Sequence, residues 1–245
     1  AACCDPQGVF DRFGNFFLVY LGLHYNADLD INEYNVYLAM STDGGQTFPT
    51  ITQLTTSGTN DQPSLAVGPS YLPGSDSIWV TYNNDDRIAA RGALVSGLGS
   101  VGPFNPAQEA PGTRGSFGNI AIGPAGQVLV TYQDGGDHAN IGPSRIFVNL
   151  DPDGLQSDTT AFGAQITVAV TQVGSFRLIP AQSNDYGIDA EANLAWDYSS
   201  GSHKGRVYLV YTDAANELTN DTDIMLRYSD DSGATWSAPL RVNDD

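Results

Sequence analysis

The sequence predicts an all-β fold, a β-propeller built from four blades of four antiparallel strands. Three observations predict it. Four segments share one shape, each opening on a turn residue, running through β-branched and aromatic residues and ending in tyrosine. An eight-residue pattern occurs twice, at equivalent places in the first and last repeat. No stretch shows a convincing amphipathic helix. Four-stranded units that repeat along a chain and pack radially make a β-propeller.

The four tyrosine-ended segments are expected to be the second strand of each unit. They are GNFFLVY (14–20), DSIWVTY (76–82), GQVLVTY (126–132) and GRVYLVY (205–211). A shorter apolar run precedes each one across a turn, so each pair predicts a hairpin. These first strands are QGVFD from Gln7, PSLAVG from Pro63, GNIAIG from Gly118 and EANLAWD from Glu191.

A third and a fourth run follow in each unit. The third runs are NVYLAMS (35–41), RIAARGALV (87–95), SRIFVNL (144–150) and DIMLRYS (223–229). The fourth runs are ITQLT from Ile51, an ill-defined stretch near 104–108, AQITVAV from Ala164 and APLRVN from Ala238. The predicted blades are therefore about 1–58, 59–113, 114–175 and 176–245 of a single propeller domain or segment.

The repeated eight-residue pattern is Ser-x-Asp-x-Gly-x-Thr-aromatic, and it lies between the third and fourth strands of units one and four. Its glycine can take a positive φ in a tight turn, and its aspartate can accept backbone N–H bonds. Its aromatic residue can pack back onto the blade. The residues are Ser41, Asp43, Gly45, Thr47 and Phe48, and then Ser229, Asp231, Gly233, Thr235 and Trp236. We expect both copies to be structural.

This pattern resembles the Asp-box, or BNR repeat, of sialidase-like β-propellers. In that family the motif forms a hairpin turn at the outer rim of a blade, away from the functional face, which implies a folding role here. The resemblance covers nearly the whole chain as a repeat pattern. Related propellers include sialidases, other glycosidases, a photosystem assembly factor and sorting receptors, so the fold does not settle the activity.

Asp-box propellers usually have six or more blades, whereas this sequence predicts four blades. Two alternatives stay open: a four-bladed propeller, or an arc of a larger propeller completed by further chain or by another molecule. An open arc would leave the faces of its end blades bare and apolar, and it would be expected to associate with itself or with the remainder of the propeller.

A sialidase site, as the resemblance implies it, needs three arginines, a Tyr–Glu nucleophile pair and an acid/base aspartate. The sequence FRLIP (176–180) departs from the family's Phe-Arg-Ile-Pro by one inserted residue, which leaves Arg177 as a weak candidate beside the alternative of a surface arginine. Glu191 stands near Asp189, and such a pair could do acid/base work if one pKa were raised. A cap or a cation ligand is the alternative for this pair.

Charge limits the partners of the chain. It has 28 acidic and 10 basic residues and a net charge of −18, which argues against nucleic acid. It has no run of 18 apolar residues that would predict a membrane span. Two acidic loops at equivalent positions gather oxygen ligands of the kind Ca²⁺ prefers, and solvated loop carboxylates are the first explanation to set against a calcium site. Their candidate ligands are Asp28, Asp30 and Asn32, and Asn220, Asp221 and Asp223.

The two cysteines, Cys3 and Cys4, are adjacent, so a vicinal disulfide, a bridge to another chain and reduced thiols all stay open. We expect an extracellular, cell-surface or periplasmic module for non-catalytic recognition or assembly. A glycan is the first expected ligand and a protein the second. The alternatives are a glycoside hydrolase of sialidase type and a structural cell-surface protein.

Overall fold

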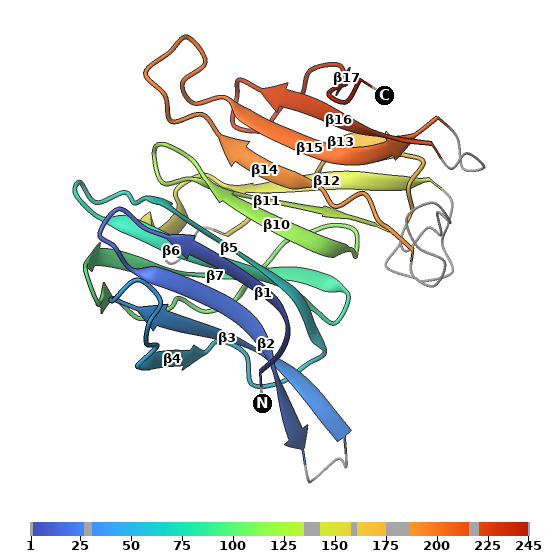
Figure 1. Cartoon of the computed structure of the whole chain (residues 1–245). Coiled ribbons are helices and arrows are strands. Elements are labelled where there is room, and N and C mark those ends of the chain that lie inside the picture. The colour runs from blue at the N-terminus through green and yellow to red at the C-terminus, as the bar shows by residue number, and fades with distance from the viewer. Residues whose placement is uncertain are drawn as a thin grey trace.

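A computed structural model describes residues 2–26, 31–134, 143–157, 161–174, 187–215 and 221–244. Within these ranges the regular structure is entirely strand, apart from one turn of 3₁₀-helix, η1 (Gly154–Gln156). The strands form four antiparallel sheets that follow one another along the chain, and Figure 1 shows them as successive layers from the first sheet to the last. No helix long and apolar enough to cross a membrane occurs in the described ranges.

Each sheet is one blade, with its strands in sequence order from the inner to the outer edge. The first contains β1 (Ala2–Phe10), β2 (Phe16–Asn26), β3 (Ile31–Ser41) and β4 (Thr50–Gln53). The second contains β5 (Asn60–Pro69), β6 (Asp76–Asn84), β7 (Arg87–Gly97), β8 (Ser100–Val101) and β9 (Gln108–Glu109). The third contains β10 (Ser116–Ile122), β11 (Val128–Gln133), β12 (Ser144–Asp151) and β13 (Ile166–Thr171). The fourth contains β14 (Asn193–Trp196), β15 (Val207–Ala214), β16 (Thr222–Ser229) and β17 (Leu240–Arg241).

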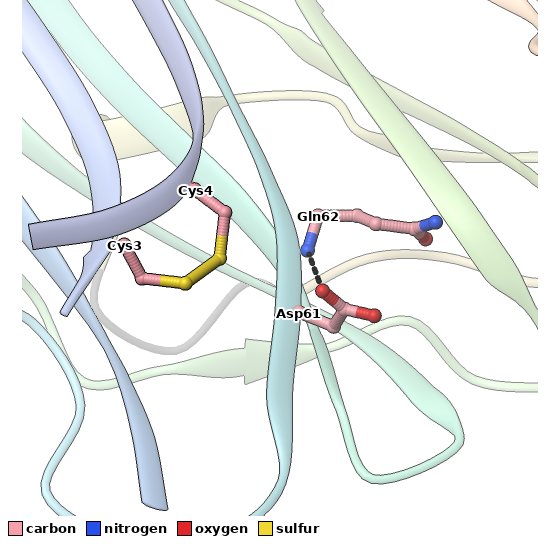
Figure 2. The surroundings of a disulfide bond; sticks show 4 residues. All are labelled: Cys3, Cys4, Asp61 and Gln62. Carbon is pink, nitrogen blue, oxygen red and sulfur yellow. Dashed lines mark hydrogen bonds between the residues drawn. A yellow bond between two sulfur atoms is a disulfide. The ribbon is translucent and has the colours of Figure 1, made fainter. Parts of the chain in front are cut away.

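The predicted all-β class with four-stranded blades is confirmed, with two differences of detail. The outer edge of the second blade is split, because β8 and β9 both pair with β7. The first strand begins at Ala2 rather than near Gln7, because Cys4 packs against the first core and brings the chain before it into register with β2. Cys3 and Cys4 form a vicinal disulfide in this strand, and Figure 2 shows it with Asp61 and Gln62 of β5 in its surroundings.

Three buried clusters hold the blades together, one at each junction between neighbours. Alternation along the strands sends one set of side chains to each face of a sheet. Phe17 and Val19 of the first blade meet Val80 of the second. The other face of the second blade contributes Trp79 to a cluster with Val130 of the third. A third cluster joins the third blade to the fourth. The inner strands pack in the order β1, β5, β10, β14.

The two eight-residue loops, 41–48 and 229–236, close on their own side chains in the same way. The serine Oγ donates to the aspartate Oδ1 at 2.7 Å in both loops, and the same Oδ1 accepts from the threonine N–H at 2.9 Å and 2.8 Å. Gly45 and Gly233 have φ values of 89° and 92°. Hydrogen bonds from Thr47 and Ser41 lower the pKa of Asp43 to about 2. The serine and aspartate side chains of both loops therefore form hydrogen bonds within their own loop.

Candidate functional site

The four innermost strands share one backbone irregularity. Each has a non-glycine residue in the left-handed region at or just before the start of its regular pairing: Asp5 (φ 51°), Gln62 (φ 47°), Phe117 (φ 59°) and Glu191 (φ 44°). In β1, β5 and β10 the ladder to the neighbouring strand shifts register at the same place. Such residues cost roughly 1–3 kcal/mol each and concentrate at functional sites. Their recurrence in all four blades therefore points to a site.

These four residues surround one pocket of about 340 Å³. Every innermost strand or its entry contributes to the wall, including the first and the last, so the pocket lies where the four blades converge. We call it the axial pocket. It is lined by Asp5, Pro6, Gln7, Gln62, Pro63, Ser64, Phe117, Gly118, Asn119, Glu191, Ala192 and Asn193.

Hydrogen bonds between blades hold the walls of the axial pocket. The side-chain oxygen of Gln7 accepts from the Leu65 N–H at 2.6 Å. Asn119 uses both ends of its amide: its nitrogen donates to Ser64 Oγ at 3.0 Å, and its oxygen accepts from the Leu194 N–H at 3.0 Å. The pocket is thus organised before any ligand arrives, which lowers the entropic cost of binding.

The chemistry of the axial pocket is that of a hydrogen-bonding site with acidic character. Asp5 and Glu191 supply carboxylates, while the remaining polar groups are neutral amides and a hydroxyl. Phe117 and two prolines supply apolar surface. No lysine or arginine of the described chain belongs to the lining. The pocket therefore suits a ligand rich in hydroxyl groups and free of negative charge.

The structure places the predicted carboxyl pair together. The Glu191 N–H donates to Asp189 Oδ1 at 2.8 Å, and Ala190 between them is held by its N–H to Gln133 Oε1 at 2.8 Å. Removal from water raises the pKa of Asp189 to about 8, helped by a hydrogen bond with the Glu191 side chain and by its charge. Glu191 also faces the axial pocket, while both residues line a second cavity of about 330 Å³ beside Thr212.

The arginines of the described ranges lie outside the axial pocket. Five of those in the described ranges pair with aspartates outside the axial pocket: Arg12 with Asp76, Arg114 with Asp86, Arg145 with Asp134, Arg206 with Asp230, and Arg241 with Asp223. Arg177 lies outside the described residues. No arginine of the described ranges lines the axial pocket, so the three-arginine clamp that the sialidase resemblance implies is not found there.

The predicted calcium ligands fall mostly outside the description. Asp28, Asp30 and Asn220 lie outside the described residues, and only the backbone of Asn32 is described. The Asp223 carboxylate accepts from Asn243 Nδ2 at 3.0 Å and approaches Arg241 Nη1 at 3.4 Å. In the ranges that the structure covers, no three His, Cys, Asp or Glu residues gather as a metal site. Calcium binding stays a prediction.

Sequence reasoning singled out Glu191 but missed the equivalent positions Asp5, Gln62 and Phe117. A signal was present, because aligning the four units on their first strands gives Asp-Pro-Gln, Gln-Pro-Ser, Phe-Gly-Asn and Glu-Ala-Asn. Each triplet ends in a polar residue whose side chain lines the pocket. The first residue of the triplet is different in each of the four units, so only an alignment of the repeats could identify these four residues as equivalent.

Comparison with solved structures now identifies the architecture. The Hadza microbial sialidase Hz136 matches 95% of this chain and 45% of its own length, with a TM-score of 0.53 and 11% identity. The GH93 α-L-arabinofuranosidase of Fusarium graminearum, solved with arabinobiose, matches 96% of this chain and 64% of its own length, with a TM-score of 0.50 and 12% identity. The chain has a β-propeller fold.

At these identities the likeness concerns the fold alone, and the chain spans less than two thirds of the length of either structure. An endo-arabinase from Bacteroides thetaiotaomicron VPI-5482 also matches, over 100% of this chain and 82% of its own, with a TM-score of 0.49 and 14% identity. No protein-family model and no curated protein sequence matches the chain.

Proposed function

We propose that the chain is an extracellular, non-catalytic recognition module that binds a glycan in the axial pocket. One observation carries the proposal: all four innermost strands, each through a strained residue, build one pocket with polar walls fixed by hydrogen bonds between blades. Sugars offer many hydroxyl groups that need such partners. The Fusarium neighbour was solved with arabinobiose, which makes a neutral oligosaccharide the first ligand class to test.

Charge narrows the ligand class further. Asp5 and Glu191 face the pocket, and the chain carries a net charge of −18. A sugar carboxylate bound there would meet like charge without a compensating cation among the lining residues, whereas uncharged hydroxyls and ammonium groups could donate to both carboxylates. Neutral and amino sugars are therefore favoured over sialic acid.

Isothermal titration with arabino-, xylo- and glucosamine oligosaccharides and with sialyllactose tests the proposal. We expect at least one neutral or amino sugar to bind, and Glu191→Gln to weaken it about tenfold because a charge-assisted hydrogen bond is lost. Glu109→Gln is the matched control, since Glu109 is exposed on β9 and lies outside the pocket lining. Tighter binding of sialyllactose would refute the charge argument, and no binding by any sugar would refute the proposal.

A glycoside hydrolase is the second candidate, favoured by the contact between Asp189 and Glu191. A carboxyl group that holds its proton near neutral pH can act as a general acid beside an ionised partner. Product analysis of the same sugar incubations separates the two functions. Hydrolysis of a sugar by the unmodified chain, abolished in Glu191→Gln, would show that the chain is an enzyme rather than a recognition module. A chain that neither binds nor cleaves any of the sugars would favour a structural role at the cell surface.

The compartment is part of the proposal. A disulfide between Cys3 and Cys4 supports an oxidising environment outside the cytoplasm, because such bonds persist there. Alkylation followed by mass spectrometry should find both thiols protected until a reductant is added. Two reactive thiols in the native secreted protein would count against this localisation.

Calcium should raise the melting temperature more than magnesium does at equal ionic strength, if one of the acidic loops binds it. Ca²⁺ accepts irregular oxygen ligands, whereas Mg²⁺ sheds water reluctantly. Binding to the folded state alone then stabilises by mass action. Thermal unfolding in the two chloride salts measures the difference, with Asp30→Ala and Asp221→Ala to locate the loop. Equal shifts in both salts would mean screening of the −18 charge alone.

A further inference from the structure

We propose that the loop 151–157 of the third blade is a pH-sensitive clasp, held closed by one proton that Asp151 and Asp153 share. We call it the third-blade loop. It follows β12 and contains η1, and it occupies the place that the two eight-residue loops, 41–48 and 229–236, occupy between the third and fourth strands of their blades. No residue of the third-blade loop lines the axial pocket, so the clasp is separate from the proposed glycan site.

Asp151 occupies the place of the serine in the eight-residue loops. It ends β12 opposite the first residue of β11, in the same way that Ser41 ends β3 opposite the first residue of β2 and Ser229 ends β16 opposite the first residue of β15. An aspartate follows two residues later in all three loops. The residue after that aspartate has φ values of 75°, 54° and 60° in the first, third and fourth blades. The three loops therefore begin with the same backbone turn.

The backbone hydrogen bonds of the three loops also agree. The N–H of the aspartate donates to the side-chain oxygen two residues before it at 3.3 Å in every case. A glycine N–H donates to the same oxygen at 2.9 Å from Gly45, 2.8 Å from Gly233 and 2.9 Å from Gly154. Each oxygen thus accepts two backbone hydrogen bonds, and the loops differ in the bond that joins this side chain to the aspartate.

The bond between the two side chains needs a proton. In the eight-residue loops the serine O–H donates to the aspartate Oδ1 at 2.7 Å. An ionised carboxyl group can only accept, so Asp151 and Asp153 can form the corresponding bond only when one of them is protonated. Two ionised carboxylates would repel each other and leave the contact without a donor, whereas one proton restores the bond that the serine provides.

The burial of Asp151 favours its protonated form. The residue is 0% exposed, and its Oδ2 receives no hydrogen bond from an N–H or O–H group of the described ranges. Removal from water raises the pKa of Asp151 to about 6, against the lowering effect of the Gly154 N–H and with help from the side-chain hydrogen bond and charge of Asp153. The pair therefore keeps a shared proton in mildly acidic solution, where an ordinary aspartate has lost its own.

In the described ranges, the elements packed around the third-blade loop supply no cation to neutralise the pair. The β10–β11 turn and, behind it, the β5–β6 loop lie beside Gly154, and Tyr71 is their one titratable side chain. β7 contacts η1 and carries two arginines. Arg87 begins this strand, opposite the last residue of β6, and Arg91 donates to two backbone carbonyl oxygens, one in each of the first two blades. The charge that acts on Asp151 is that of Asp153.

The third-blade loop holds Leu155 in the junction between the second and third blades. Leu155 packs against the buried cluster of Trp79 and Val130, and with Tyr71 and Phe104 it lines an apolar cavity of about 420 Å³. When the proton is lost, two like charges in contact and out of water favour an open loop in which water reaches both carboxylates. Opening draws Leu155 away from the cavity, so the cavity is closed in mildly acidic solution and accessible at higher pH.

The effect on stability has a defined range of pH. The pKa of Asp151 is raised in the folded chain, so the folded chain binds the extra proton. The contribution of this group is therefore complete below about pH 4, decreases from 4 to 6 and is lost above about pH 6. Asp189, with a pKa of about 8, acts over a range that extends to higher pH. A step near pH 6 is thus specific to the third-blade loop.

Carbon-13 NMR of the side-chain carboxyl groups tests the clasp in the unmodified chain. We expect the signals of Asp151 and Asp153 to share a titration step near pH 6. Asp43 is the internal control, because hydrogen bonds from Thr47 and Ser41 lower its pKa to about 2, so its signal should show no step near pH 6. Titration of both Asp151 and Asp153 at the ordinary value of an aspartate would overturn the proposal.

Asp151→Asn keeps the shape of the side chain and supplies an N–H donor that does not titrate, so it should keep the loop closed at every pH. Hydrogen exchange followed by mass spectrometry compares residues 152–157 in this variant and in the unmodified chain at the same pH, which cancels the intrinsic pH dependence of exchange. We expect equal exchange at about pH 5 and exchange on the order of tenfold slower in the variant at about pH 8. Asp151→Ser, with the residue of the two eight-residue loops, should behave in the same way.

Asp43→Asn is the matched control, since it changes the corresponding loop of the first blade, where a serine hydroxyl donates in place of a shared proton. It should leave exchange in residues 152–157 unchanged at both pH values. A ratio of exchange rates between Asp151→Asn and the unmodified chain that is the same at both pH values would count decisively against the clasp. The NMR titration needs no variant, so it decides the matter even if both substitutions of Asp151 unfold the chain.

Discussion

Replacing Trp79 with alanine should lower the free energy of unfolding by about 3–5 kcal/mol, the usual cost of removing a fully buried aromatic side chain. Trp79 is 0% exposed and belongs to the cluster between the second and third blades, together with Ile88 and Val130. Its indole lies over Gly92, the residue opposite it on β7, where an added Cβ would overlap the ring. The neighbouring backbone is therefore shaped around this side chain and cannot collapse cheaply into the cavity.

Trp79→Phe provides the comparison that keeps this prediction testable if the alanine variant fails to fold. The indole N–H is buried without a hydrogen-bond partner in the described structure, so phenylalanine removes an unsatisfied donor along with part of the volume. We expect a clearly smaller loss than with alanine. Equilibrium unfolding in urea measures both variants. A loss below about 1 kcal/mol for Trp79→Ala would contradict the proposed role of this cluster.

The strands were predictable because their physics is local. The segments 76–82 and 126–132 are continuous runs of β-branched, apolar and aromatic residues, buried at nearly every position because a blade packs on each face. They end in Tyr82 and Tyr132, which belong to the clusters at two blade junctions. The shortest strands were harder to predict from the sequence. β8 and β9 have two residues each, and their pairing with β7 depends on where the chain between them can lie, which residue propensity does not specify.

The axial pocket was hardly predictable from single residues. Asp5, Gln62, Phe117 and Glu191 have different chemistry, and of the four only aspartate is a residue type enriched in the left-handed region, so the surrounding sheets impose this backbone. Glu191 and Asp189 were found because carboxyl groups two residues apart suggest a functional pair. That Glu191 also faces Asp5 across the pocket depends on the approach of the first and fourth blades, a property of the tertiary fold.

Replacing Asp189 with asparagine should remove a large part of the pH dependence of stability. The pKa of this carboxyl group is raised from 3.8 to about 8, first by removal from water and then by the hydrogen bond and charge of Glu191. An unfolded aspartate titrates near its ordinary value, so between about pH 4 and pH 8 the folded state binds the extra proton. The stability that this group contributes is therefore complete below about pH 4, decreases as the pH rises from 4 to 8, and is lost above about pH 8.

Asparagine has nearly the same shape and cannot ionise, so the variant should match the unmodified chain near pH 4 and exceed its stability above pH 8 by on the order of a few kcal/mol. Urea unfolding across this range measures the difference, and subtraction cancels the repulsion among the other carboxylates. Asp244→Asn, at an exposed position, is the control. Glu191→Gln should lower the pKa of Asp189 by removing the like charge while leaving the desolvation, so the fall in stability moves to lower pH without disappearing. Parallel curves for Asp189→Asn and the unmodified chain would show that Asp189 does not hold this proton.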